Sequence, residues 1–260
     1  MPIEGDAGQP QTIQFLRIGF TRLTLDGLIA EIRRRAKEPH FSFVVTPNVD
    51  HVVKLFPRRP PAHTVAFQAA YDAAALRVCD SRILHRLAVL AGEDMPVLPG
   101  SDLTSILMRS VFEKGDRIAV IGGRAHTIAV LEALFPGPEY LQHIPPMGVL
   151  DNEHAMAEIG AFVARVKPTV TLFAIGAPQS EIAAHKCRNT AGATGVGLCI
   201  GASIDFLTGD QKRAPVWMQK AGLEWLYRLM HDPVRLWRRY LVEGPRVFGL
   251  FFRMRFRSVR

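Results

Sequence analysis

Polar side chains follow the ends of apolar runs in this chain, where they are placed to do chemistry. Thr46, Asn48 and His51 stand at and after the end of FSFVVT (41–46), and Asp80 follows the next short run. A carboxylate in such a place is a candidate general base, if an acceptor hydroxyl lies within hydrogen-bond distance. The alternative is that these residues only cap helices, Asn48 or Asp50 at the first helix and Asp80 or Ser81 at the second. Spacing alone leaves both roles open.

A pair of glycines, Gly122 and Gly123, marks the turn IGGRAHT (121–127) between an apolar run and a helical pattern. Backbone N–H groups at such a turn can approach a diphosphate, and the helix dipole favours that negative charge. The spacing does not match GxGxxG, so a dinucleotide site has little support. A tight turn without any ligand is the alternative.

Two further runs end in glycine and polar residues. GAPQSE (176–181) supplies Gly176, Pro178, Gln179 and Glu181, and GASIDF (201–206) supplies Ser203 and Asp205. Ligands of open α/β sheets bind beyond the carboxyl ends of the strands. These strand ends together therefore predict one shared pocket.

The elements that must position these residues alternate between two patterns. The runs 41–46, 117–123, 169–176 and 195–201 are typical of buried parallel strands, and 126–135 and 156–166 have helical spacing. This alternation predicts an α/β fold, a Rossmann-like and mostly parallel sheet flanked by helices. We expect a disordered tail over 1–12, a catalytic domain over 13–210 and a helical basic appendage over 211–260.

The charge of the chain is concentrated at its C-terminal end. Of 260 residues, 48% are hydrophobic, and the net charge is +8. Residues 212–260 hold 12 of the 32 basic and 3 of the 24 acidic residues, a net of +9 that leaves −1 for the rest. Such asymmetry predicts an anionic partner for this segment.

The same C-terminal segment mixes aromatic residues with arginines. Helical spacing places Leu236 and Tyr240 near one face, and Arg235, Arg238 and Arg239 largely on another. This pattern suits an interfacial helix on anionic lipid. The alternatives are a packed helix with a solvated basic face, and a nucleic-acid patch, which no binding signature supports. We expect a membrane surface as the partner and no nucleic acid.

Three cysteines without a CxxC pair indicate neither a disulfide framework nor a zinc site. The N-terminus has no signal-peptide pattern, and no uncharged apolar run is long enough to span a bilayer. These features favour a reduced, cytoplasmic compartment. No HExxH, HxxxH or DxD motif is present, so we expect no cofactor and no metal requirement.

Taken together, these strings resemble the WecG/TagA/CpsF family of bacterial glycosyltransferases, over about residues 16 to 241. The most specific string is TGDQKRAPVWMQKAGLEWLYRLMHDPVRLWRRYL (208–241). TPNVDH, PGSDL (99–103), IGG, GAP-E and the ASIDF-TG stretch occur in the order of the family.

The resemblance implies an inverting enzyme that moves a sugar from a UDP donor to a polyprenyl diphosphate-linked sugar, peripheral on the inner face of the cell membrane. Asp80 matches the aspartate taken as catalytic base, and Thr46 matches the threonine of the T-x-N motif. The remaining residues expected to bind substrate are Asn48, His51, Ser81, Arg82, Ser101, Asp102, Gly122, Gly123, Gly176, Pro178, Gln179, Glu181, Ser203, Asp205, Arg213 and Arg228. Arg213 and Arg228 of the appendage are expected to neutralise the leaving diphosphate.

Departures from the family pattern fall on the predicted donor pocket. Ser81 stands where the family has Gly, and Ser180 where it has Gln. They favour a UDP-hexose donor resembling UDP-glucose and a role in exopolysaccharide or cell-surface polysaccharide assembly, with N-acetylmannosaminyl or mannosaminuronyl transfer as the alternative. A nucleotide-dependent oxidoreductase would need a glycine fingerprint, and a non-enzymatic adaptor on membrane or nucleic acid would leave the polar strand ends unexplained.

Overall fold

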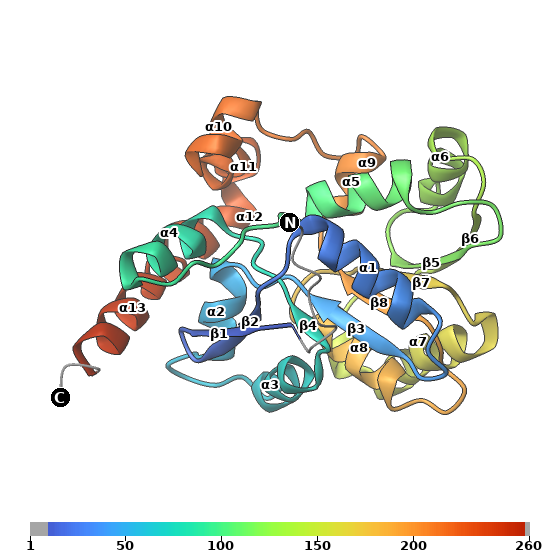
Figure 1. The fold of residues 1–260 in the computed structure, drawn as a ribbon, viewed down its shortest axis with the longest axis horizontal. Coiled ribbons are helices and arrows are strands. Elements are labelled where there is room, and N and C mark those ends of the chain that lie inside the picture. The colour runs from blue at the N-terminus through green and yellow to red at the C-terminus, as the bar shows by residue number, and fades with distance from the viewer. Residues whose placement is uncertain (1–9, 258–260) are drawn as a thin grey trace, which may run out of the picture.

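The structure is a computed structural model that describes residues 10–257. Its centre is a six-stranded sheet of order β4-β3-β8-β7-β5-β6, in which every neighbouring pair is parallel (Figure 1). The strands are β3 (Ser42–Val45), β4 (Leu76–Arg77), β5 (Arg117–Gly122), β6 (Glu139–His143), β7 (Val170–Ala174) and β8 (Val196–Cys199). The predicted α/β fold is confirmed.

The strands are apolar on both faces because helices cover both. Phe43 and Val45 belong to one buried cluster, whereas Val44 between them belongs to the other. Successive strand residues point to opposite faces, so a strand covered on both sides needs an apolar residue at every position.

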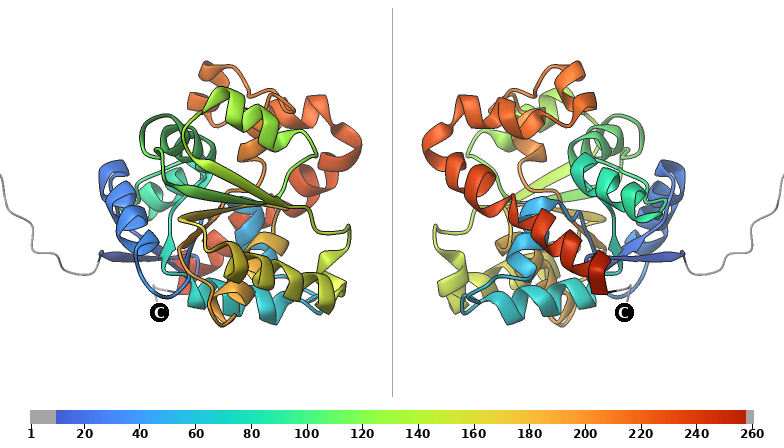
Figure 2. Two further views of the ribbon diagram at one scale, coloured as in Figure 1. Left: turned by 90° about the vertical axis from the view of Figure 1, so that its right-hand side faces the viewer. Right: turned by 90° about the vertical axis from the view of Figure 1, so that its left-hand side faces the viewer.

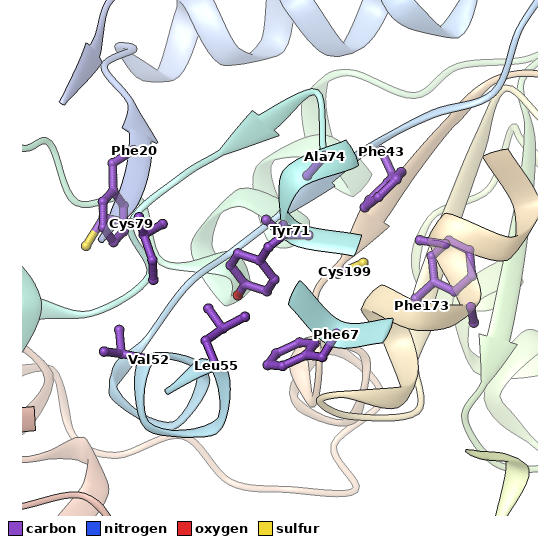
Figure 3. Packing of buried hydrophobic residues seen from close by; sticks show 14 of the residues in the cluster. Phe20, Phe43, Val52, Leu55, Phe67, Tyr71, Ala74, Cys79, Phe173 and Cys199 are labelled. Carbon is purple, nitrogen blue, oxygen red and sulfur yellow. The ribbon is translucent and has the colours of Figure 1, made fainter. Parts of the chain in front are cut away.

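One face of the sheet carries α2 (Val49–Leu55), α3 (Thr64–Ala73), α7 (Glu153–Val166, after the 3-10 turn η1, Val149–Asp151) and α8 (Gln179–Arg188). The other face carries α1 (Leu25–Ala36), α5 (Gly100–Ser110), α6 (Thr127–Leu134) and α9 (Ser203–Leu207). Helix α4 (Arg82–Ala91) follows β4 and packs with the first group. Figure 3 shows part of that cluster, where Phe67 and Tyr71 of α3 make an edge-to-face pair with ring centroids 5.0 Å apart.

A two-stranded hairpin precedes the sheet and was not predicted. Strands β1 (Thr12–Phe15) and β2 (Ile18–Thr21) are antiparallel, with Thr12 opposite Thr21. The predicted tail therefore ends before Thr12, because this residue is already paired. Residues 1–9 of that tail lie outside the described residues.

The C-terminal segment is helical, as predicted, and consists of α10 (Val216–Ala221), α11 (Glu224–His231), α12 (Pro233–Trp237), the π-helical turn η2 (Arg238–Glu243) and α13 (Arg246–Arg257). It wraps back along the α/β core (Figure 2). Val247 is buried, and the Phe251 ring lies 6.2 Å from the Phe15 ring of the hairpin. Arg239 pairs with buried Asp50 of α2 at 3.2 Å. Contrary to the expected basic face, Arg239 thus points into the protein.

None of the helices formed by residues 10–257 combines the length and the apolar character that crossing a membrane requires.

Candidate active site

Asp80 lies just beyond the carboxyl end of β4, where two groups hold its carboxylate. The backbone N–H of Gly100 donates to Oδ1 at 2.6 Å, and Asn48 Nδ2 lies 3.4 Å from Oδ2. Burial raises the pKa of Asp80 to about 6, although these hydrogen bonds and the positive charge of Arg228 oppose the rise. A carboxylate of this pKa is a stronger base than an ordinary aspartate and is still ionised at neutral pH.

Gly100 brings three polar side chains around one small space. A Cβ atom built on Gly100 would lie 3.6 Å from Thr46 Oγ1, 3.6 Å from Ser203 Oγ and 3.8 Å from Asp80 Oδ1. The two hydroxyls donate to backbone carbonyls, Thr46 to Cys199 at 2.8 Å and Ser203 to Ile200 at 2.6 Å. Because their protons are committed, these oxygens face the space beside Gly100 as hydrogen-bond acceptors.

Asn48 has both of the roles that the sequence left open. Its side-chain oxygen caps α2 by accepting from the N–H groups of Asp50 and His51, while its nitrogen faces Asp80. Ser81 rather than Asp80 caps α4, accepting from the N–H of Leu84 at 3.3 Å. The capping interpretation therefore holds for Asn48 and Ser81, and it leaves Asp80 free for chemistry.

The appendage places Arg228 in this region, and its predicted role in binding substrate stays a prediction. Arg228 pairs with Glu224 at 2.9 Å, and its guanidinium lies 4.9 Å from the centre of the Phe206 ring. The charges of Arg228 and Glu224 both act on the pKa of Asp80, so α11 lies near the carboxylate. Because Glu224 and Phe206 fix its position, Arg228 is pre-organised beside the candidate base.

Three more predicted residues join the appendage to the core. Arg213 donates to Asp102 of α5 at 2.7 Å and to Gln219 of α10 at 2.9 Å. Arg82, the first residue of α4, lies beneath the turn between α10 and α11, where a Cβ on Gly222 would be 3.9 Å from the Arg82 Cβ. The start of the appendage is therefore docked beside Asp80.

A groove runs along α5 away from this site. It has a volume of about 260 Å³. Its lining residues are Ser101, Ser105, Arg109, Leu134, Phe135, Phe206, Leu207 and Arg213. Hydroxyls, guanidinium groups and aromatic rings together suit a ligand with sugar or phosphate groups.

Gly122 and Gly123 form a sterically crowded turn. Both have positive φ, and a Cβ on Gly122 would come within 2.6 Å of Ile175 Cγ2. Gln142 of β6 donates to the carbonyls of Gly122 and Arg124, both at 2.9 Å. Packing alone accounts for the glycines, and the predicted diphosphate contact stays a prediction.

The loop after β7 lies on the same rim. A Cβ added at Gly176 would meet no atom within 4 Å, and the Ala177–Pro178 peptide bond is cis. Lys54 Nζ donates to the carbonyl of Ala177 at 2.8 Å, and the Gln179 Oε1 atom is buried without a protein partner. An amide oxygen in this state would accept a hydrogen bond from a ligand that reaches the loop.

Two residues that the sequence predicts to bind substrate, His51 and Glu181, are enclosed by packing. His51 is 7% exposed, and its Nδ1 lies 2.7 Å from the Tyr71 hydroxyl; burial lowers the pKa of His51 to about 3. Glu181 is 1% exposed, lies 4.0 Å from His51 Nε2, and burial raises the pKa of this carboxyl to about 8. Both side chains pack within the core behind the site, and their predicted contact with substrate stays a prediction.

Asp205 belongs to a polar cluster on the other side of the rim. It accepts from Gln211 at 3.0 Å, and burial raises its pKa, whereas the nearby charges of Arg124 and Arg235 oppose the rise. Asp210, which the sequence did not indicate, pairs with Arg124 at 3.4 Å and with His126 at 3.2 Å. The cluster lies beside the Gly-Gly turn, with the charge of Arg235 of α12 nearby.

Sequence reasoning missed Gly100, Glu224 and Asp210. Gly100 was inside the PGSDL string, but a backbone N–H leaves no signal in residue type. Glu224 stands four residues before Arg228, the spacing of a helical ion pair, which was available as a signal. Within residues 10–257, no group of three His, Cys, Asp or Glu side chains is arranged to hold a metal ion.

Comparison with known proteins identifies the protein family to which these sequence motifs belong. Residues 13–260 match the family described as "Glycosyl transferase WecG/TagA/CpsF family". The chain is also 34% identical over 149 residues to the N-acetylglucosaminyldiphosphoundecaprenol N-acetyl-beta-D-mannosaminyltransferase of Bacillus spizizenii. That match covers 55% of each protein, so the chain spans about half the length of this relative.

Proposed function

The chain belongs to the WecG/TagA/CpsF family of glycosyltransferases, and on this basis we propose that it transfers a sugar from a UDP donor to a sugar on a polyprenyl diphosphate. The observation that supports this most is the Asp80 carboxylate, held by Gly100 at 2.6 Å at the rim of the sheet, with a pKa raised by burial to about 6. An oxidoreductase and a non-enzymatic adaptor have no such support.

In the proposed reaction, Asp80 takes the proton of the acceptor hydroxyl as its oxygen attacks the anomeric carbon. The C–O bond to UDP breaks on the opposite face, so an α-linked donor gives a β-linked product. Thr46 and Ser203 present acceptor oxygens beside Gly100 and would receive hydrogen bonds from sugar hydroxyls. Asn48 helps to orient the carboxylate.

The departing diphosphate needs positive charge or N–H donors. We assign this role first to Arg228 and Arg213, which α11 and the segment before α10 bring next to Asp80 and α5. The N–H groups near Gly123 are a further source. The proposal needs no metal, so transfer should continue in the presence of a chelator.

The donor sugar is proposed from the relative rather than from the fold. The name of the Bacillus spizizenii protein specifies an N-acetylmannosaminyl donor group and an N-acetylglucosaminyl acceptor on diphosphoundecaprenol. This supports the N-acetylmannosaminyl alternative over the UDP-glucose-like donor favoured by Ser81 and Ser180. We therefore propose UDP-N-acetylmannosamine as the first donor to test.

A polyprenyl acceptor places the reaction at a membrane surface, and the appendage has a suitable exterior. Trp217, Val234, Trp237 and Leu241 are exposed apolar side chains, and Arg238 lies exposed among them. Apolar side chains interleaved with arginine favour the interface of an anionic bilayer. We propose peripheral association with the cytoplasmic face of the cell membrane.

The test is transfer of radiolabelled sugar from a panel of UDP-sugars to a short-chain polyprenyl diphosphate-N-acetylglucosamine, with and without chelator. The proposal expects product from UDP-N-acetylmannosamine, insensitive to the chelator. Product only from a UDP-hexose would restore the donor favoured by the sequence. If folded, vesicle-bound protein uses no donor in the panel, the proposed reaction is wrong.

A further inference from the structure

The loop that follows the edge strand β6 is exposed, apolar and outside the site described above. It consists of residues 144–148, Ile-Pro-Pro-Met-Gly, and the uncharged stretch continues to Leu150. Met147 is 100% exposed, more than any other large apolar side chain among the described residues, and Ile144 is 51% exposed. A single exposed apolar residue is ordinary, but an uncharged run of this kind on one projecting loop is not.

Both ends of the loop are fixed to the core. His143, before it, stacks on Phe162 of α7 with ring centroids 5.4 Å apart, and Val149, after it, is buried. Two prolines restrict the backbone between them, and Gly148 turns the chain with φ of 76°. Met147 is therefore held out into solvent by an anchored loop.

The loop leaves the sheet at the rim that carries the candidate active site. His143 is paired with Ile121, so the loop begins beside the Gly122–Gly123 turn. In both views of Figure 2, it projects from the same side of the sheet as α11 and α12. Asp205 lies near Arg124, which follows this turn, and near Arg235 of α12, since both charges act on its pKa. The rim thus lies between two elements that expose apolar side chains.

We propose that residues 144–148 are a second membrane-contacting element, which enters the interfacial region of the bilayer opposite the appendage. This inference rests on the proposed membrane-borne acceptor. The partner is a lipid surface because the two elements face the same way, the loop bears no charge, and α12 and η2 add the exposed cations Arg235 and Arg238 that anionic headgroups attract. Two contacts on either side of the rim would turn the Asp80 site toward the bilayer, whereas one contact would leave the molecule free to tilt.

A thiol probe tests the placement directly. The three native cysteines are buried, so a fluorophore sensitive to polarity would label an introduced cysteine selectively. We would label Met147→Cys, Val234→Cys on α12, and Ala191→Cys at the opposite rim, where Ala191 is exposed in the turn before β8. Each is titrated with vesicles of phosphatidylethanolamine and phosphatidylglycerol.

The inference predicts a blue shift and brighter emission at positions 147 and 234, and none at 191. If position 234 responds and position 147 behaves like position 191, the loop does not contact the membrane, although the proposed function stands. If neither 147 nor 234 responds, both the loop inference and the proposed membrane association are wrong.

A pair of double variants gives an independent measurement. Ile144→Ser with Met147→Ser should weaken partitioning onto these vesicles about tenfold, because two partly inserted apolar side chains are lost. Ile144→Val with Met147→Leu keeps the apolar character and should bind like the parent. Thermal unfolding checks that both fold. Equal vesicle binding by the serine variant and the parent would overturn the inference.

Discussion

The backbone N–H of Gly100 donates to the Asp80 carboxylate at 2.6 Å, joining the first residue of α5 to the end of β4. This hydrogen bond orients the candidate base without neutralising it, because an N–H group favours the ionised carboxylate. Burial acts in the opposite sense and prevails, so the pKa of Asp80 rises to about 6. The site combines a fixed geometry with a base suited to neutral pH.

The first prediction concerns the pH profile of catalysis. A general base works when it is ionised, so kcat/KM should rise with pH through about 6 and then level off. Asn48→Ser keeps a capping oxygen but removes the amide that faces Asp80, which should move the inflection to higher pH. Steady-state rates across the pH range measure both. An inflection that stays in place in Asn48→Ser would show that this amide does not act on the base.

A second prediction separates the effect of filling the site on activity from an effect on the stability of the fold. Gly100→Ala adds a methyl group at ordinary contact distances, 3.6 Å or more, so the fold should tolerate it. Activity should nevertheless fall at least about tenfold, because the methyl would occupy the space beside Asp80.

Gly122→Ala is the matched comparison for Gly100→Ala. Its Cβ would lie 2.6 Å from Ile175 at a positive φ, and it should lower the free energy of unfolding by about 1–3 kcal/mol. Urea denaturation and transfer rates measure the two effects. Full activity in Gly100→Ala would place the acceptor elsewhere.

The third prediction concerns the two charges that α11 places near Asp80. Arg228→Ala should raise the pKa of Asp80 and lower kcat/KM about 100-fold, because it also removes the positive charge that would stabilise the leaving diphosphate. Glu224→Gln should move the pH inflection the other way, because it removes a negative charge. If both variants shifted the inflection in the same direction, α11 would not place its two charges near Asp80 as described.

The fourth prediction tests how the appendage is held. Asp50 pairs with Arg239 at 3.2 Å and with Lys54 at 2.8 Å, and although burial acts against it, these cations hold the pKa of Asp50 below its usual value. Asp50→Asn should cost about 1–3 kcal/mol of unfolding free energy, less than a fully buried pair because both cations are partly exposed.

The pH dependence of this contribution has a definite sign. Because the pKa is lowered in the folded state, the stabilisation is present above the unfolded value near 4 and is lost as the pH falls below it. Glu38→Gln, which breaks an exposed pair with Arg34, should change stability by less than about 0.5 kcal/mol. Equal effects of the two substitutions in urea denaturation would contradict the anchoring role of Asp50.

The sequence predicted the elements with strong local signals. Buried apolar runs predicted β3, β5, β7 and β8, but not β6, whose residues Glu-Tyr-Leu-Gln-His are typical of a half-exposed edge strand. The hairpin was missed because its turn uses Leu16 and Arg17 at positive φ rather than glycine. Local patterns contain little information about such positions.

Long-range contacts explain the remaining differences at the site. Asp80 was predicted from its place after a strand, whereas its partner Gly100 is 20 residues away and acts through its backbone. The sequence placed His51 at the rim, whereas in the structure Tyr71 of α3 packs against it and encloses it. Residue type predicted the chemistry, and tertiary packing decided which side chains reach the surface.

The central claim is that Asp80 is the catalytic base, and the most direct test is single-turnover transfer by Asp80→Asn, which keeps the shape of the side chain and an acceptor for the Gly100 N–H. The account predicts a loss of at least about 100-fold in the transfer rate, with donor binding and folding retained. Transfer within a few-fold of the parent, by a variant that is equally folded, would remove Asp80 from the reaction.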